Sequence, residues 1–362
     1  MALPTKDQIS QSVETNGNIL DPRLAGFNTI EGVLGPECYS GGFCLVYPVT
    51  DGTEKYAFRV WHTEIEGIKD RLKKISSYLS THPLPYFVDF DYVAEALNVY
   101  DEDGNSQKID AVRMQWVEGK NLVLYIDSII SDSSLSESEK SQRLKDLAMR
   151  FKTMVGELHN VSIAHGDLQH GNIIVADDGS ILLVDYDSVY VPTFTDEEQV
   201  TSGMASYQHP CRKNNNYIAS KADDYFSEQI IYLSLLCYAE RPSLWESIEE
   251  RDEYSLLFTE SDLSDISRSL LFKDLCQIQD TEIQKLLQEL EKNLSFPDTS
   301  QIRPLEDVLI NSYEMQPEGK QLDEDDISSL IGDVKPKATY KKQIDEVPDF
   351  DEQAAQSRYS QN

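Results

Sequence analysis

The sequence is short of cysteine, of positive charge and of long hydrophobic runs, and each shortage excludes a class of protein. Its five cysteines are widely spaced and include no C-x-x-C pair, which argues against zinc ribbons, redox dithiols and disulfide frameworks. The start, MALPTKDQISQSVETNGN, lacks a basic stretch followed by an apolar core, so we expect a cytoplasmic rather than a secreted protein. The most apolar run, IIYLSLLCYA, is much shorter than the roughly 20 residues that cross a bilayer.

Positive charge is outnumbered two to one, with 32 Lys and Arg against 64 Asp and Glu, for a net charge of −32. Such a field repels phosphate backbones and anionic headgroups, so we expect neither a nucleic acid nor a membrane surface as a partner. A protein substrate or partner of basic character fits the charge better. The length of 362 residues and the hydrophobic content of 40% are sufficient for a large core in two lobes or domains.

Residues 27–118 carry the pattern of a small antiparallel sheet with one helix. Apolar residues at three- or four-residue intervals predict the helix at 65–80. Residues 1–26 are polar and weakly patterned, and we expect a leader that lies on the surface or is partly disordered. Short apolar runs separated by Gly-rich and Asp-Gly turns predict five strands, at 28–35, 44–49, 55–60, 87–93 and 108–117.

Helical patterns dominate from residue 119 to residue 312. The stretch 142–161 has a long apolar stripe, and 223–239 is apolar on nearly all sides, as in a central buried helix. Residues 313–362 are acidic and hold few large apolar side chains, so we expect a disordered tail that acts as a solvated tether. The fold class is therefore α+β, with a small sheet-rich part followed by a larger and mainly helical part.

One stretch, AHGDLQHGN at 164–172, combines side chains that are useful in phosphate chemistry. It is followed by NIIV and ILLV, which would pair as a hairpin across the turn ADDGS. Such a hairpin would bring Asn172 and Asp185 to one edge, where their oxygens could bind Mg²⁺. The alternative is that both residues are only turn formers at the ends of the hairpin.

This stretch resembles the catalytic loop of the protein-kinase-like superfamily, H-R-D-x-x-x-x-N, with His165, Asp167 and Asn172 on its three marked positions and Gly166 in place of the Arg. The H-G-D form is similar to the loops of aminoglycoside and choline phosphotransferases, of RIO-type kinases, and of bacterial kinase-like proteins that carry HGDLQHGN itself. The resemblance extends over 27–312. It implies a bilobal fold with an N-lobe at 27–118 and a C-lobe at 119–312, and ATP and Mg²⁺ as cofactors.

The resemblance also implies a role for each matching residue. Asp167 would orient the acceptor hydroxyl, and Asn172 and Asp185, the latter in DYD at the D-F-G position, would bind Mg²⁺. His165 would pack and hydrogen-bond within the loop. Asp224, at the start of a long helix that resembles D-x-W-S-x-G, would hold the backbone of the catalytic loop.

The N-lobe motifs depart from the family pattern. YSGGFCLVYPV resembles the phosphate-binding glycine loop, with Gly41 and Gly42 at its turn and Val46 on its valine, although a simple Gly-Gly hairpin is the alternative. Arg59 stands where the family has the lysine that binds the α- and β-phosphates. The helix at 65–80 should offer a glutamate to pair with this cation, but its central turns carry none.

The stretch AVRMQWVEGKNL resembles the hinge that receives adenine. Met114 would take the gatekeeper position, and Gln115 to Val117 would offer backbone groups to the base. An ordinary edge strand and turn is the alternative interpretation.

Other departures concern cations near the γ-phosphate. Gln169 replaces the lysine that reaches that phosphate in protein kinases, and His170 is a candidate substitute. Asp187 replaces the glycine of D-F-G. Without an Arg at 166, a phosphate added to the following loop would lack its usual partner, so we expect no switching by loop phosphorylation. A zinc site among His159, His165, His170 and His209 is a minor alternative.

The sequence thus supports three functional hypotheses. The leading one is an ATP- and Mg²⁺-dependent phosphotransferase, most of all a protein Ser/Thr kinase that includes itself among its substrates. The second is a pseudokinase that binds nucleotide or partners without turnover, which the departures at Arg59, Gln169 and the glycine loop favour. The third is a nucleotidyl transferase, in which ATP binds in another orientation.

Overall fold

The computed structural model describes residues 3–32, 35–213, 217–247 and 254–310. All of these described residues belong to one compact unit. The acidic tail predicted at 313–362 lies outside the described residues. No helix among the described segments is long and apolar enough to cross a membrane.

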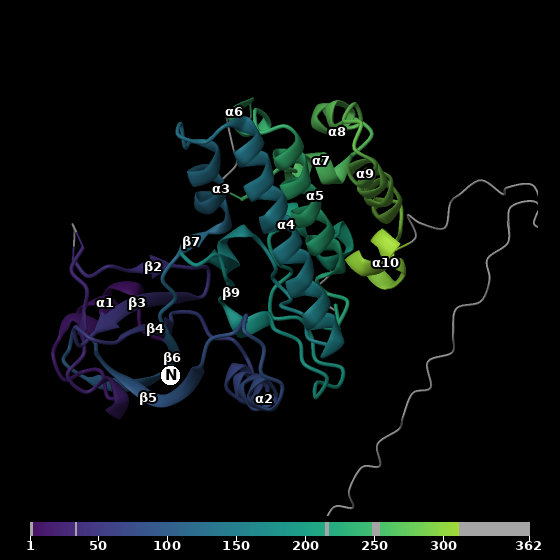
Figure 1. The fold of residues 1–362 in the computed structure, drawn as a ribbon. Helices are drawn as coiled ribbons and strands as arrows, with labels where there is room; N and C mark the ends of the chain where they lie inside the picture. The colour runs from purple at the N-terminus through teal and green to yellow at the C-terminus, as the bar shows by residue number, and fades with distance from the viewer. Residues whose placement is uncertain (1–2, 33–34, 214–216, 248–253, 311–362) are drawn as a thin grey trace, which may run out of the picture. The chain divides into compact units, whose positions relative to one another are not determined.

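The N-terminal part is built on a curled antiparallel sheet, as predicted (Figure 1). Its order is β1-β3-β4-β6-β5, and β2 pairs with β3 on the same edge as β1, so the sheet is five strands wide. In the run expected as one strand at 28–35, the described residues form only the short strand β1. The strands are β1 (Asn28–Thr29), β2 (Tyr39–Ser40), β3 (Cys44–Thr50), β4 (Lys55–Trp61), β5 (Phe90–Tyr100) and β6 (Ser106–Gln115).

One face of this sheet is covered by the segment that we expected to be a polar leader. Helix α1 (Lys6–Glu14) begins with a capping box between Thr5 and Gln8. Its Ile9 and Val13 are buried in one core with β3, β4, β5 and β6, and Leu24 joins them. The expectation of a surface leader was wrong, because these few apolar side chains suffice to cover a sheet face.

The other face of the sheet carries the residues singled out for function. Along β4, Phe58 and Val60 point into the core beneath α1, so Arg59 and Trp61 point to the opposite face. Helix α2 (Ile68–Thr81) packs on that opposite side through Leu72 and begins and ends close to the predicted bounds.

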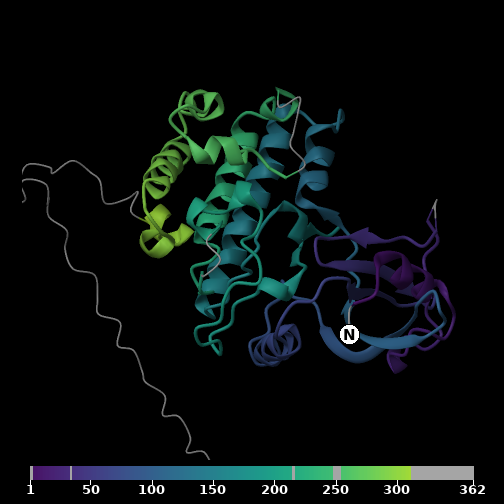
Figure 2. The same ribbon diagram turned by 180° about the vertical axis from the view of Figure 1, so that it is seen from behind.

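The rest of the described chain is mainly helical, as predicted. Helix α5 is buried on nearly all sides and lies beside α4 in both views (Figures 1 and 2). This part of the chain also contains a small sheet with the strand order β7-β8-β9. The elements are β7 (Lys120–Asn121), α3 (Leu122–Ile130), α4 (Glu137–Asn160), β8 (Ile173–Val175), β9 (Ile181–Leu183), α5 (Tyr225–Glu240), α6 (Leu244–Ser247), α7 (Glu260–Ser264), α8 (Leu270–Leu275), α9 (Thr281–Leu294) and α10 (Leu305–Ile310).

Candidate functional site

The loop 164–172 lies between α4 and β8, and it is held by Asp224, the residue directly before α5. The backbone N–H groups of His165 and Gly166 both donate to the carboxylate of Asp224, the second at 2.9 Å. The His165 ring is fully buried and its Nε2 donates to the Val184 carbonyl at 2.9 Å. These contacts are the ones expected of Asp224 and His165, and they fix the loop against the strand end that precedes Asp185.

Gly166 is required by the backbone itself. Its φ is +78°, and a Cβ built there would lie 2.3 Å from the Ser188 carbonyl oxygen. Next to it, Ala164 and Tyr190 exchange backbone hydrogen bonds of 3.3 and 2.8 Å. The H-G-D glycine is therefore the residue that lets the loop lie directly against 188–190.

Asp167 is partly buried and held from two sides. The Asn172 side-chain amide donates to its carbonyl at 2.8 Å, and the Met204 N–H donates to its Oδ1 at 3.3 Å. Burial raises the pKa of Asp167 above its ordinary value, and the charge of Asp185 adds to the rise, although the His165 charge opposes it. A carboxylate of raised pKa in this position is suited to accept a proton.

The β8–β9 hairpin brings Asn172 and Asp185 to one edge, as predicted. Ile173 pairs with Leu183 at the open end of the hairpin, and the Val184 N–H donates to the Asn172 carbonyl at 3.1 Å. Asp185 has φ +67° and ψ 74°, an uncommon conformation for a residue with a side chain. Its carboxylate is 45% exposed, so an oxygen remains accessible to a cation from solution.

Arg59 finds its partners in the DYD segment. Its two terminal nitrogens donate to the two Asp187 oxygens, each at 2.6 Å, and one of them also lies 2.9 Å from Asp185 Oδ1. Its Nε donates to Cys44 Sγ at 3.0 Å. Burial acts to lower the pKa of Arg59, but the charges of Asp185 and Asp187 outweigh it and raise the pKa well above the ordinary value.

Arg71, which no sequence motif indicated, attaches α2 to the segment after Asp185. Its guanidinium donates to the carbonyls of Asp187, Ser188 and Val189 at 2.7, 3.2 and 3.1 Å. It also lies over the Phe194 ring, 4.6 Å from the centroid. The sequence did contain one signal for it. Arg71 adjoins Leu72 within the apolar stripe of the helix, and a charge that is buried there requires hydrogen-bond acceptors.

The Gly-Gly turn and Val46 lie next to Arg59. The Gly41 N–H donates to the Cys44 carbonyl at 2.9 Å, which closes the turn, and Val46 pairs with Arg59 across β3 and β4. Gly42 would meet nothing within 4 Å if it carried a Cβ. The turn is closed by this hydrogen bond, and the position of a side chain at Gly42 is open.

The expected hinge begins within the last two residues of β6 and continues beyond the strand to Val117. Met114 is buried and pairs with Ala57. Gln115 and Trp116 donate their backbone N–H groups to the carbonyls of Asp89 and Lys55 at 3.0 and 3.1 Å. Among the expected hinge residues, Val117 is the one whose N–H makes no backbone hydrogen bond to the described part of the chain.

Gln169 and His170, the residues considered near the γ-phosphate, both make contacts within the chain. The Gln169 side chain turns back and accepts from the Gly171 N–H at 2.6 Å. His170, the proposed substitute, is buried, and its Nδ1 lies 2.5 Å from the Tyr207 hydroxyl. Both side chains stabilise the loop.

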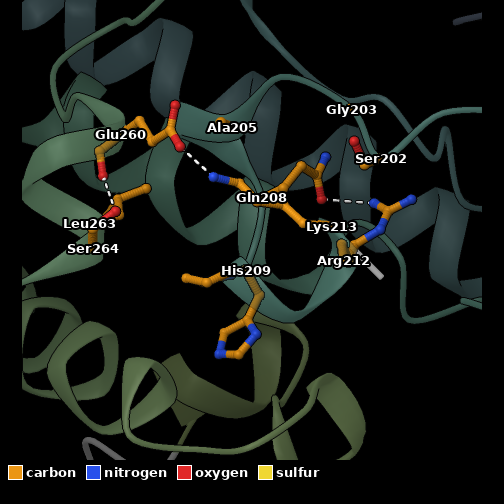
Figure 3. Close-up of a pocket in the computed structure, with 11 residues that line it drawn as sticks. Ser202, Gly203, Ala205, Gln208, His209, Arg212, Lys213, Glu260, Leu263 and Ser264 are labelled. Atoms are coloured by element: carbon orange, nitrogen blue, oxygen red, sulfur yellow. Dashed lines mark hydrogen bonds and ion pairs between the residues drawn. The ribbon is translucent and has the colours of Figure 1, made fainter. Parts of the chain in front are cut away.

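A small hollow borders the site on the side of the loop 202–213 and helix α7 (Figure 3). Its volume is about 30 Å³, which accommodates water-sized groups. Arg212 donates to Gln208 at 2.6 Å and Lys213 pairs with Glu260 along its wall. Gly203, in the same loop, would place a Cβ 3.0 Å from Asp167 Oδ1.

The zinc alternative receives no support from the described residues. The one group there with three potential ligand atoms within 4.8 Å is His159, Glu228 and Glu306. Each ring nitrogen of His159 faces a different carboxylate, at 2.9 and 2.8 Å. These distances are those of ion pairs and leave no space for a metal between the atoms.

The chain was compared with models of known protein families and with curated proteins, and it matches none of them. The site is therefore interpreted from its own residues.

Proposed function

We propose that this chain is an ATP- and Mg²⁺-dependent phosphotransferase of the protein-kinase-like superfamily that acts on protein serine or threonine hydroxyls, its own included. The observation that carries the proposal is the convergence of Asp167, Asn172 and Asp185 on one edge of the β8–β9 hairpin, with Arg59 beside them. The curled sheet with α2, followed by a helical part, supports the bilobal fold of that superfamily. A cytoplasmic location and a basic protein partner stay predictions of the sequence.

The side-chain oxygens of Asn172 and Asp185 are suitable ligands for magnesium. The Asn172 amide nitrogen is used by Asp167, so its amide oxygen is the atom available to a cation. Asp185 adds a half-exposed carboxylate, and hard oxygen ligands of this kind are the ones that Mg²⁺ prefers. Bound Mg²⁺ would neutralise charge on the phosphates during transfer.

Arg59 is the cation proposed for the α- and β-phosphates. Its guanidinium is nearly buried and carries two carboxylate partners, which keep it charged at any accessible pH. The Gly41-Gly42 turn lies next to it through Cys44, and Gly42 is exposed, with nothing within 4 Å of a Cβ built there.

Asp167 is the proposed proton acceptor. In the proposed reaction a bond forms between the acceptor oxygen and the γ-phosphorus, the bond from that phosphorus to the ADP oxygen breaks, and the hydroxyl proton passes to Asp167. Its raised pKa favours this transfer, and Asn172 and Met204 keep its carboxylate in place.

Substitution of Asp167 tests the proposal. Purified wild type and Asp167→Asn are incubated with Mg²⁺ and γ-labelled ATP, and the label is followed into the protein, added basic proteins and free phosphate. We expect wild type to transfer label and the variant to lose about 100-fold or more of the rate, because the proton acceptor is gone. Equal melting temperatures would show that the fold is retained.

Two other outcomes have defined meanings. Transfer of label from α-labelled ATP, and none from γ-labelled ATP, would replace phosphoryl with nucleotidyl transfer. Nucleotide-dependent stabilisation without any transfer would favour the scaffold hypothesis, for which the inward turn of Gln169 is the specific observation. No stabilisation by ATP with Mg²⁺ would contradict both nucleotide-dependent functions.

A further inference from the structure

Arg59 has an unusual counter-ion for a cation in this position. Its bidentate partner, Asp187, lies only two residues after Asp185 in the chain, and both acids contact the same guanidinium. The Asp187 side chain is 8% exposed, and the Trp61 indole N–H approaches its Oδ2 at 3.5 Å. The paired distances of 2.6 Å are those of a strong, charge-assisted bidentate contact.

Helix α2 does not compete for this role. The only acidic residue within its bounds is Asp70, which is exposed. In its place the helix presents Arg71, which donates to three backbone carbonyls from Asp187 to Val189. The helix therefore holds the backbone that carries Asp187, and Asp187 in turn holds Arg59.

The second acid changes what Arg59 does to Asp185. A guanidinium that had Asp185 as its sole partner would satisfy its charge on that carboxylate, which would then be less available to a metal. Asp187 accepts a hydrogen bond from each of the two terminal nitrogens, whereas Asp185 lies 2.9 Å from one of them through its Oδ1. The Asp185 side chain remains 45% exposed.

We propose that Asp187 is a positioning residue that takes up the charge of Arg59 and so leaves Asp185 free to bind Mg²⁺. The inference rests on the proposed function, because it concerns the same metal and nucleotide. In this proposal the three-residue segment 185–187 carries both the metal ligand, Asp185, and the counter-ion of Arg59, Asp187.

The test measures the Mg²⁺ concentration at which half of the ATP-dependent thermal stabilisation appears, with ATP saturating. In Asp187→Asn, Arg59 has Asp185 as its remaining acid, so Mg²⁺ must compete with it and the midpoint should rise about tenfold or more. Asp187→Glu keeps the charge and should stay within about threefold of wild type.

The outcomes separate this inference from the proposed function. A wild-type protein without Mg²⁺-dependent stabilisation by ATP would overturn both. A wild type that responds, with an Asp187→Asn variant that melts lower but keeps the wild-type Mg²⁺ midpoint, would overturn only the role of Asp187. If Asp187→Asn does not fold, Asp187→Ser carries the test, and a Mg²⁺ midpoint within about threefold of that of wild type would contradict the competition.

Discussion

Gly166 and Asp185 both hold backbone conformations with positive φ within the same site, at +78° and +67°. Such conformations are costly for residues with side chains and persist where the surroundings impose them. Gly166 avoids the cost by having no Cβ, whereas Asp185 bears it in a position that aims its carboxylate at Arg59. At the scale of single residues, the site therefore depends on the missing Cβ of Gly166 as well as on the carboxylate of Asp185.

Replacing Gly166 by alanine should destabilise the protein. The new Cβ would lie 2.3 Å from the Ser188 carbonyl oxygen, in a conformation that alanine rarely adopts, so we expect the free energy of unfolding to fall by about 2 kcal/mol or more. Gly156→Ala is the matched control. It lies within α4 with nothing within 4 Å of its added Cβ, and it should stabilise by about 0.5–1 kcal/mol. Denaturant unfolding of both variants measures the difference, and equal effects would contradict the steric argument.

Helices α1 and α2 cover opposite faces of the same sheet and do different work at the scale of elements. Helix α1 closes a purely apolar core with β3 to β6. Helix α2 combines an apolar stripe with Arg71 and so attaches the sheet to the segment after Asp185. The salt bridge of Lys74 with Glu197, at 2.6 Å, adds a further contact between α2 and that segment. The segment after Asp185 is thus held in part by charged side chains of α2.

Truncating Ile9 tests whether α1 is part of the core. Its side chain is fully buried in the sheet cluster, so Ile9→Ala should lower the free energy of unfolding by about 2–4 kcal/mol. Gln11→Ala, at an exposed position of the same helix, should change it by less than about 0.5 kcal/mol. Thermal or urea unfolding provides the values. A surface leader, as the composition first suggested, would make the two variants indistinguishable.

An ion-pair cluster joins three helices at the scale of the whole molecule. His159 in α4 lies between Glu228 in α5 and Glu306 in α10. Burial alone would lower the pKa of His159, but hydrogen bonds and charges of both glutamates outweigh it and raise the pKa to about 9. Burial raises the pKa of Glu228 to about 7, against the effect of His159. Glu228 also accepts from the Leu305 N–H at 2.7 Å, so the cluster fixes the start of α10.

Stability should therefore decline as the pH rises through the range of these two groups. A raised pKa in the folded state means that the folded protein binds the proton more tightly, so the contribution of His159 is complete below pH 6.5 and lost as the pH passes about 9. The contribution of Glu228 to stability has the same sign and is lost as the pH rises from about 4.5 to about 7. Between pH 6 and 10 we expect His159 to account for about 2–3 kcal/mol. His159→Gln should flatten this part of the melting-temperature profile, and parallel profiles would contradict the assignment.

Local patterns were sufficient for much of the fold. The spacing of apolar residues in 65–80 and the continuous apolar character of 223–239 predicted α2 and the buried α5, because periodicity and burial leave a direct trace in the chain. The hairpin beside Asn172 and Asp185 followed from two apolar runs and a turn. For residues 1–26 the pattern was too short, since two buried side chains one turn apart in α1 are a weak signal.

The sequence by itself determined the α+β fold class, the sheet of five strand positions, and the grouping of Asp167, Asn172 and Asp185, because these depend on residues near one another along the chain. Only the tertiary structure decided the partners of Arg59 and Arg71. Arg59 meets Asp187 across 128 positions and Arg71 meets the same residue across 116. Contacts at such separations have no periodicity, and each depends on the packing of whole elements against one another before the two partners can meet.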